Sequence, residues 1–112
     1  MKRYIRATTI SKDILDQAVY HAKSSGDSRG TVIDVPNHKI ILVFGAGIDR
    51  EDLFDSEIGL GTWFIQNGFN VETEVKDVEY LTKGTLNTRA MRREGVGNKR
   101  VLRNRVVMTI TW

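Results

Sequence analysis

The chain has 112 residues, of which 40% are hydrophobic and 28% are charged, with ten glycines, one proline and no cysteine. This length and composition are typical of one compact domain, and the lack of cysteine excludes disulfide scaffolds, thiolate metal sites and cysteine nucleophiles. The formal net charge of +3 says little by itself about a partner.

The first predicted elements are a short strand and a helix. Tyr4–Thr9 is rich in β-branched and aromatic residues, which favours a strand. Ser11 is placed to cap a helix whose apolar residues recur at three- and four-residue spacing over Ile14–Ala22. Gly26, free to adopt a positive φ, predicts that this helix ends near Ser25.

Two β-rich runs follow, TVIDV and KIILVF, with only Pro36, Asn37 and His38 between them. Such a short connection with turn-forming residues predicts an antiparallel hairpin. The run Ile40–Phe44 is continuously apolar, which is typical of a central strand covered on both faces.

A second helical region is predicted over residues 49–65, with Asp49 as its cap. Its apolar face is interrupted by Gly59 and Gly61, and each glycine inside a helix costs about 1 kcal/mol relative to alanine. The region is therefore either two short helices or one helix packed closely on the sheet. Gly68 is expected to end it.

The C-terminal part contains two further predicted strands. Phe69–Val75 alternates apolar and polar residues, and beyond Asp77 the alternation changes phase, which indicates a bulge or a break. Arg105–Trp112 is the clearest strand of the chain. Between them, Lys83–Asn104 is polar and basic, and we expect a long loop or a protruding hairpin there.

Together these elements predict a single α+β domain over residues 1–112. We expect one mainly antiparallel sheet with two helical regions packed on one face, and a basic loop or hairpin at about residues 83–105. The first six elements follow the order of a ferredoxin-like split βαβ unit, with a C-terminal strand added. No apolar run reaches the roughly 20 residues of a membrane helix and no secretory signal is present, so we expect a cytoplasmic protein.

Charge is divided unevenly along the chain. Residues 83–112 hold eight basic residues and one acidic residue, a net charge of +7, whereas residues 1–82 hold nine basic and thirteen acidic residues, a net charge of −4. Guanidinium groups concentrated on a segment that is not expected to be buried favour phosphate binding. The candidate binding residues are Arg89, Arg92, Arg93, Lys99, Arg100, Arg103 and Arg105.

We therefore expect a small non-enzymatic protein, without a cofactor, that binds nucleic acid or a nucleoprotein complex through this basic segment. No aromatic residues are interleaved with the arginines, which argues against sequence-specific recognition of single strands. The alternative partner is an acidic protein surface, in which case the chain is a protein inhibitor or assembles with itself, for example as a homodimer. A third alternative is a small ribonuclease toxin that uses His38 with arginines as phosphate stabilisers.

Two other patterns are more simply explained by local structure than by chemistry. The carboxylates that begin at Asp49 lack the spacing of a calcium loop, and a helix N-terminus attracts acidic residues for electrostatic reasons alone. The sequence Gly45-Ala46-Gly47 lacks the third glycine of a dinucleotide-binding turn, because position 50 is arginine. We expect these glycines to be turn residues and assign no metal ligand.

The opening residues MKRYIRA resemble the start of many small uncharacterised proteins from phages and mobile elements of Gram-positive bacteria. The resemblance covers Met1–Ala7 only. Such proteins include anti-CRISPR and other anti-defence inhibitors, which are compact, need no cofactor and bind a nucleoprotein target. The resemblance implies a binding protein and identifies no functional residue.

Overall fold

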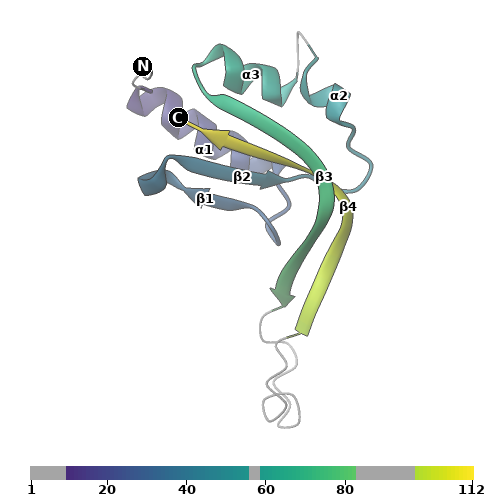
Figure 1. Ribbon diagram of the computed structural model, residues 1–112. Helices are drawn as coiled ribbons and strands as arrows, with labels where there is room; N and C mark the ends of the chain where they lie inside the picture. The colour runs from purple at the N-terminus through teal and green to yellow at the C-terminus, as the bar shows by residue number, and fades with distance from the viewer. Residues whose placement is uncertain (1–9, 56–58, 83–97) are drawn as a thin grey trace, which may run out of the picture.

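The computed structural model describes residues 10–55, 59–82 and 98–112. In chain order its elements are α1 (Lys12–Ser25), β1 (Val32–Asp34), the 3₁₀ turn η2 (Val35–Asn37), β2 (Lys39–Val43), α2 (Arg50–Leu53), α3 (Leu60–Gln66), β3 (Asn70–Thr82) and β4 (Asn98–Thr111) (Figure 1). Within the described residues the strands form one sheet in the order β1-β2-β4-β3, and every neighbouring pair is antiparallel. The predicted α+β fold is confirmed. The strand predicted at Tyr4–Thr9, and with it the split βαβ order, lies outside the described residues.

Helix α1 begins and ends where its local signals predict. The hydroxyl of Ser11 accepts a hydrogen bond from the Ile14 N–H at 3.3 Å, and Asp13 lies in the first turn, where a negative charge is favoured. The positive φ expected at Gly26 is wrong, because its φ is −84°. A side chain at this position would instead collide with Thr31 Oγ1 and Leu42 Cδ2. Glycine is therefore required here for space and not for conformation.

The predicted hairpin is formed by β1 and β2. Pro36 occupies the first turn of η2, and His38, with a φ of 54°, turns the chain into β2. The Asn37 side chain donates a hydrogen bond to Asp34 across the turn at 2.8 Å. Strand β2 pairs with β1 on one side and β4 on the other, which confirms its predicted central place.

The second helical region consists of two short helices. Asp49 occupies the N-cap position of α2, but its side chain makes no capping hydrogen bond. A Cβ on Gly59 would lie 2.5 Å from the Leu53 carbonyl oxygen, and one on Gly61 would lie 2.7 Å from Phe54 Cε1. The two glycines thus let α3 pack directly against the end of α2. Gly68, with a φ of 96°, turns the chain from α3 towards β3.

Strands β3 and β4 form a long hairpin that bends sharply (Figure 1). The register shifts between Lys76 and Val78, where Asp77 on β3 faces two residues of β4, Arg103 and Asn104. This confirms the irregularity predicted beyond Asp77 and shows that the extra residue belongs to β4. Beyond the bulge, both strands project away from the helices (Figure 1).

One predicted boundary in this region is wrong. Residues 98–104 were included in the loop or hairpin expected over Lys83–Asn104, and within the described residues they are strand, with residues 98–102 paired to β3 over Val78–Thr82, as in the hairpin alternative. The final strand therefore begins at Asn98 and not at Arg105. The pattern of apolar residues did not predict this start because residues 98–104 are mostly polar. They form a strand by pairing with β3, which is distant in the sequence.

The core lies on both faces of the sheet. On the helical face, Ala18 and Ala22 of α1 and Phe64 of α3 pack on inward residues of β2 and β4, so both helical regions cover the same face, as predicted. On the opposite face, a smaller cluster of Val43, Leu102 and Val107 is covered by partly buried residues of the distal hairpin. The bend in β3 and β4 therefore brings the distal hairpin against the back of the sheet. Phe64 belongs to the first cluster, Trp63 and Trp112 pack against it, and Tyr80 packs against the second.

Candidate nucleic-acid interface

Four of the seven predicted binding residues lie on β4 within the described residues: Lys99, Arg100, Arg103 and Arg105. Arg89, Arg92 and Arg93 lie outside the described residues. The four that the structure describes differ in burial and in partners.

Lys99 and Arg100 are exposed on the projecting part of the hairpin. Arg100 pairs across the strands with Tyr80, on the face that also carries Leu102. Lys99 pairs with Leu81 and, because side chains alternate along a strand, lies on the opposite face. Within the part of the chain that the structure describes, neither cation forms an ion pair. Both charges are therefore available to a ligand.

Arg103 lies at the bulge and is only loosely held. Its Nη1 is 3.4 Å from Asp77 Oδ2, and the two side chains are 75% and 48% exposed. The other oxygen of Asp77 accepts a hydrogen bond from the Asn104 N–H at 2.9 Å, which satisfies the backbone of the bulge. An exposed pair of this kind contributes about 0.2–1 kcal/mol. Arg103 is thus free to exchange Asp77 for a stronger anion.

Arg105 does not belong to this exposed set. Its side chain is only 14% exposed, and its Nη1 lies 3.4 Å from Asp27 Oδ2. Its Nε is buried and has no hydrogen-bond partner among the described residues. The structure places this predicted binding residue in an internal ion pair, so we exclude Arg105 from the interface.

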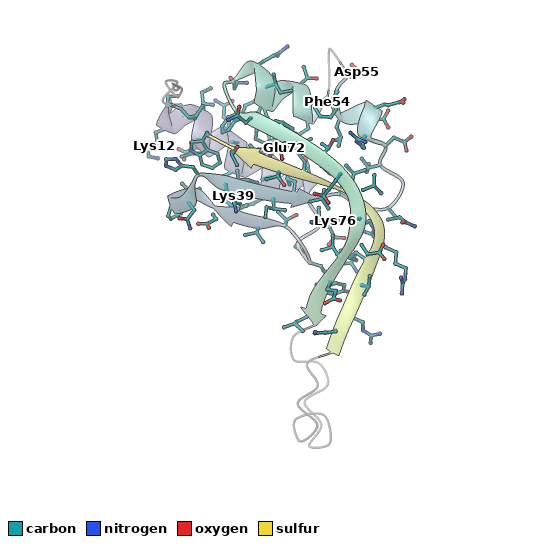
Figure 2. The ribbon with its side chains drawn as sticks, viewed as in Figure 1. Lys12, Lys39, Phe54, Asp55, Glu72 and Lys76 are labelled. Carbon is teal, nitrogen blue, oxygen red and sulfur yellow. The ribbon has the colours of Figure 1, made fainter. Side chains whose placement is uncertain are left out.

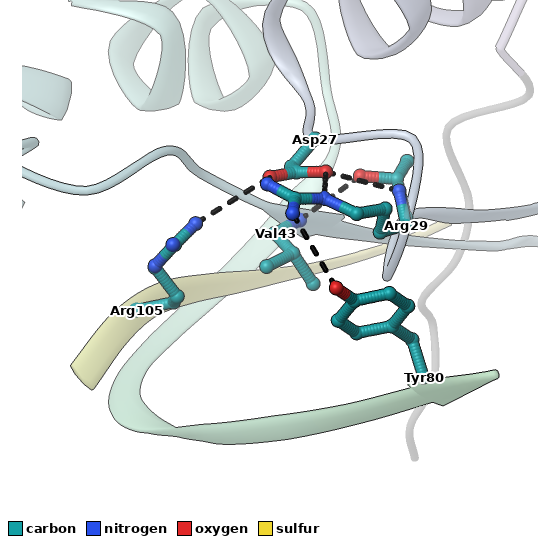
Figure 3. Close-up of polar contacts among 6 residues, drawn as sticks. Asp27, Arg29, Val43, Tyr80 and Arg105 are labelled. Atoms are coloured by element: carbon teal, nitrogen blue, oxygen red, sulfur yellow. Dashed lines mark hydrogen bonds and ion pairs between the residues drawn. The ribbon is translucent and has the colours of Figure 1, made fainter. Parts of the chain in front are cut away.

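Asp27 is the centre of a polar cluster that sequence analysis missed (Figure 3). Arg29 Nε and Nη2 donate to the two oxygens of the Asp27 carboxylate at 2.9 and 2.7 Å, and the Arg29 N–H donates to it at 3.0 Å. Arg29 also reaches the ring and hydroxyl of Tyr80, with its Nη1 3.5 Å from the hydroxyl oxygen. Through Arg105 and Tyr80, the cluster joins the loop after α1 to both strands of the hairpin.

The electrostatics of this cluster favour its charged form. Hydrogen bonds from Arg29, assisted by the charge of Arg105, lower the pKa of Asp27 from 3.8 to about 2. The same pairing raises the pKa of Arg29 further above its ordinary value. The spacing Asp27-x-Arg29 was a signal for the local contact, but the contacts with Tyr80 and Arg105 span 51 and 78 residues and have no local signature.

The two histidines make structural contacts. His38 Nδ1 lies 3.1 Å from the Trp112 carbonyl oxygen, and its ring stacks on Trp112. The ring of His21 meets the rings of Tyr20 and Trp63 edge to face. The ribonuclease alternative, which depends on His38, stays a prediction.

A cleft of about 910 Å³ lies between α2 and the bend of the hairpin. Val75 and Val106 line its strand side, and Arg50 donates through Nε to Thr73 Oγ1 at 3.1 Å beside it. Ile48 and Phe54 are 42% and 39% exposed at its other side. Among residues 10–55, 59–82 and 98–112, no three acidic or histidine side chains are grouped so as to hold a metal ion. Glu51 and the other acidic residue of α2, Asp52, are therefore not part of such a group within the described residues.

No protein-family model, curated protein or solved structure matches this chain. The resemblance at Met1–Ala7 falls on residues outside the described part and stays a prediction. Among the described helices, none is both long enough and apolar enough to span a bilayer.

Proposed function

We propose that this chain is a small cytoplasmic binding protein that engages nucleic acid, alone or in a nucleoprotein complex, through the distal β3–β4 hairpin. The observation that carries the proposal is the exposure of Lys99, Arg100 and Arg103 on the part of β4 that projects from the body (Figure 1). This part extends beyond the bend of the hairpin, where Lys76 lies on β3 (Figure 2). Cations on a projecting element can approach phosphates without desolvating the rest of the surface.

The charge of the body supports this assignment. Residues 1–82 carry a net charge of −4, and Glu72 and Glu74 lie exposed on the half of β3 nearest the body. Negative charge there repels phosphates, whereas the hairpin attracts them. The resulting field orients the molecule so that the hairpin meets a polyanion first.

Arg105 contributes indirectly. Its ion pair with Asp27, together with the contact between Arg29 and Tyr80, attaches the base of the hairpin to the body. Val78 and Leu102 pack against Val43 and Val107 beneath this attachment. The distal cations are therefore presented by an element whose base is held in place, which reduces the entropy lost on binding.

The proposal is tested by charge reversal on the hairpin. The double variant Lys99→Glu, Arg100→Glu is expected to bind labelled DNA or RNA at least about tenfold more weakly in fluorescence anisotropy, because two phosphate contacts become repulsions. Both side chains are exposed, so circular dichroism and thermal unfolding are expected to be unchanged.

The matched control is Lys23→Glu, Lys39→Glu, which changes the net charge equally on the body. Lys23 lies on α1, and Lys39 pairs with Thr111 at the opposite end of β4 from Lys99. The affinity of this control variant for nucleic acid is expected to fall by less than about twofold, which is the effect of the change in net charge alone. Equal losses in the two variants, or no nucleic-acid binding by the parent chain, would contradict the proposal.

A protein partner is the second candidate, favoured by the exposed edge of β3. Val75 and Leu81 on this edge strand are 54% and 64% exposed. An acidic protein surface, a second copy of the chain, or an anti-defence target would use such an edge by strand addition. An interface with an apolar centre depends much less on salt than phosphate binding does. Light scattering and affinity measurements at two salt concentrations therefore separate the two candidates.

A further inference from the structure

We propose that two copies of this chain form a dimer through the outer edge of β3. Strand β3 ends the sheet order β1-β2-β4-β3, and no strand of the described residues pairs with its outer side (Figure 1). The proposal commits this exposed edge to one occupant, a second copy of the chain. It does not depend on nucleic-acid binding, because the paired segment ends at the bulge and leaves Lys99 and Arg100 exposed.

The polar backbone groups of Val75 point out of the sheet edge. The Phe44 N–H donates to the Val106 carbonyl oxygen at 3.0 Å, so the backbone groups of Val106 face β2. Val106 is the residue of β4 opposite Val75. Because two opposite residues of an antiparallel pair exchange either both hydrogen bonds or none, the N–H and the carbonyl of Val75 face away from β4. A two-fold axis beside Val75 therefore lets the two copies of this residue exchange a pair of backbone hydrogen bonds.

Charge complementarity supports an axis at Val75. A two-fold dimer pairs β3 with itself in the antiparallel sense, so Glu74 lies opposite Lys76 of the second copy, and Lys76 lies opposite Glu74 of the second copy. These are pairs without backbone hydrogen bonds, in which the side chains approach more closely. Within one chain, Lys76 Nζ already lies 3.8 Å from Glu74 Oε1. The dimer joins two such ion pairs into a group of four alternating charges.

The neighbouring registers set like charges against each other. Because the outward direction of the backbone alternates along a strand, the nearest other positions for the axis are Thr73 and Asp77. An axis at Thr73 sets Glu72 opposite Glu74 of the second copy, and an axis at Asp77 sets this carboxylate opposite its own copy. Like charges directly opposite each other destabilise a strand pair. Of the outward positions 71, 73, 75 and 77, only position 75 sets opposite charges against each other.

Apolar side chains gather at the same axis. Val75 is exposed and lies on the helical face, since it stands opposite Val106 of the first core cluster. The two copies of Val75 therefore meet on that face. Val75 also lines the cleft whose other side carries the exposed Ile48 and Phe54. The dimer places the apolar residues of both clefts around the axis and removes part of their surface from water.

The bulge limits the pairing to a short segment. In this register Thr73 lies opposite Asp77 of the second copy, so the pairing covers Thr73–Asp77 in each chain. Beyond Asp77 the register shifts and β3 bends, just after Lys76 (Figure 2). A long flat edge is a hazard for open-ended aggregation, whereas a two-fold interface uses the β3 edge of each copy once and closes as a dimer.

The experiment uses two charge variants and their mixture, measured by sedimentation equilibrium without nucleic acid. Glu74→Lys and Lys76→Glu each replace the two opposite-charge pairs of the dimer by like-charge pairs, and each is expected to weaken dimerisation by about tenfold or more. When the two variants are mixed, every pair across the interface again joins opposite charges. The mixed dimer is therefore expected to form with an affinity within about threefold of the parent dimer.

A second pair of variants locates the interface on the sheet. Val75→Lys places two like charges at the axis and is expected to abolish the dimer. Val32→Lys is the matched control, because Val32 is 50% exposed on β1 at the other edge of the sheet. The control is expected to dimerise as the parent does, and circular dichroism is expected to show both variants folded, since both side chains are exposed.

The outcomes decide the proposal separately from the proposed function. A parent chain that stays monomeric up to about 1 mM overturns the dimer. So do equal losses in Val75→Lys and Val32→Lys, or a mixture of the charge variants that associates no more tightly than each variant alone. Loss in Val75→Lys with recovery in the mixture supports it. Because no nucleic acid is present, failure of the dimer leaves the test of the hairpin cations unaffected.

Discussion

At the scale of single residues, Asp27 joins parts of the chain that are distant in sequence. Its carboxylate binds Arg29 in its own loop and Arg105 on β4, and its backbone N–H donates to the Val43 carbonyl oxygen. The side chain is only 13% exposed, so its ion pairs are screened less by solvent than those on the open surface. The ion pair that links β4 to the loop after α1 therefore depends on one negative charge, beside the apolar packing of the hairpin on the sheet.

The pKa of Asp27 predicts a pH dependence of stability. Because the folded pKa of about 2 lies below the ordinary 3.8, the folded state binds fewer protons, and the stabilisation is complete above about pH 5 and lost as the pH falls through 3.8 towards 2. Replacement of Asp27 by Asn is expected to lower the free energy of unfolding by about 1–2 kcal/mol at pH 7, allowing for partial screening. Urea unfolding at pH 7 and pH 3 measures the difference, which is expected to shrink at the lower pH.

The control for this experiment is Asp16→Asn on α1. Asp16 forms an exposed ion pair with Lys12, so its replacement is expected to change stability by less than about 0.5 kcal/mol. If the difference between the parent chain and Asp27→Asn is the same at pH 7 and pH 3, the charge of Asp27 does not stabilise the fold.

Asn104 is a second residue whose role depends on conformation. Its φ of 53° is in the left-handed region, which costs most residues about 1–2 kcal/mol. Asn104→Ala is therefore expected to lower the free energy of unfolding by about 1 kcal/mol, whereas Asn104→Gly stays within about 0.5 kcal/mol of the parent. Chemical denaturation of the two variants tests this, and equal stability of both would refute a conformational role.

At the scale of elements, the distal hairpin is stable because it packs on the body. An isolated pair of strands is marginal in water, but Val78 and Leu102 cover the back of the sheet beside Val43. The loop after α1 fits against Val43 of the sheet and Val78 of the hairpin because Gly30 has no side chain. A Cβ there would lie 2.9 Å from Val43 Cγ2 and 3.0 Å from Val78 Cγ1.

Substitution of Gly30 tests this packing. Gly30→Ala is expected to separate the hairpin from the sheet and to lower the free energy of unfolding by about 1–3 kcal/mol, the usual cost of overpacking. Gly45→Ala is the matched control, since a Cβ at Gly45 meets nothing within 4 Å. Thermal unfolding of the pair measures the effect. Equal melting temperatures would show that the loop adjusts freely and that the contact does not constrain the hairpin.

At the scale of the whole molecule, charge is divided between residues 1–82, with a net charge of −4, and residues 83–112, with a net charge of +7. If the three exposed cations of the described hairpin, Lys99, Arg100 and Arg103, each neutralise one phosphate, the logarithm of the DNA association constant falls with the logarithm of salt concentration with a slope of about −3. The basic residues at positions 83–97 would steepen this slope to about −5 if six phosphates are neutralised in all.

Salt titration of the proposed nucleic-acid binding measures the slope. Lys99→Glu, Arg100→Glu is expected to make it shallower by about 2, and the body control Lys23→Glu, Lys39→Glu to leave it unchanged. A slope that is the same for all three proteins would mean that counterion release occurs elsewhere on the surface.

Much of the fold follows from signals between near neighbours. Capping by Ser11, apolar spacing in α1 and the turn at Pro36 were sufficient to predict the first helix and the β1–β2 hairpin. The irregularity at Asp77 was also visible, because the pattern of apolar residues changes there. The basic character of residues 83–105 was likewise a property of composition alone.

Tertiary structure decided which of those basic residues reach solvent. The pairing of residues 98–104 with β3, and the capture of Arg105 by Asp27, join positions up to 78 residues apart. Periodicity, capping and turn chemistry act over a few residues, so they carry no information about such pairs. The four cations of β4 cannot be told apart from the sequence. Burial beside Asp27 places Arg105 in an internal ion pair, whereas the projection of the hairpin leaves the other three exposed.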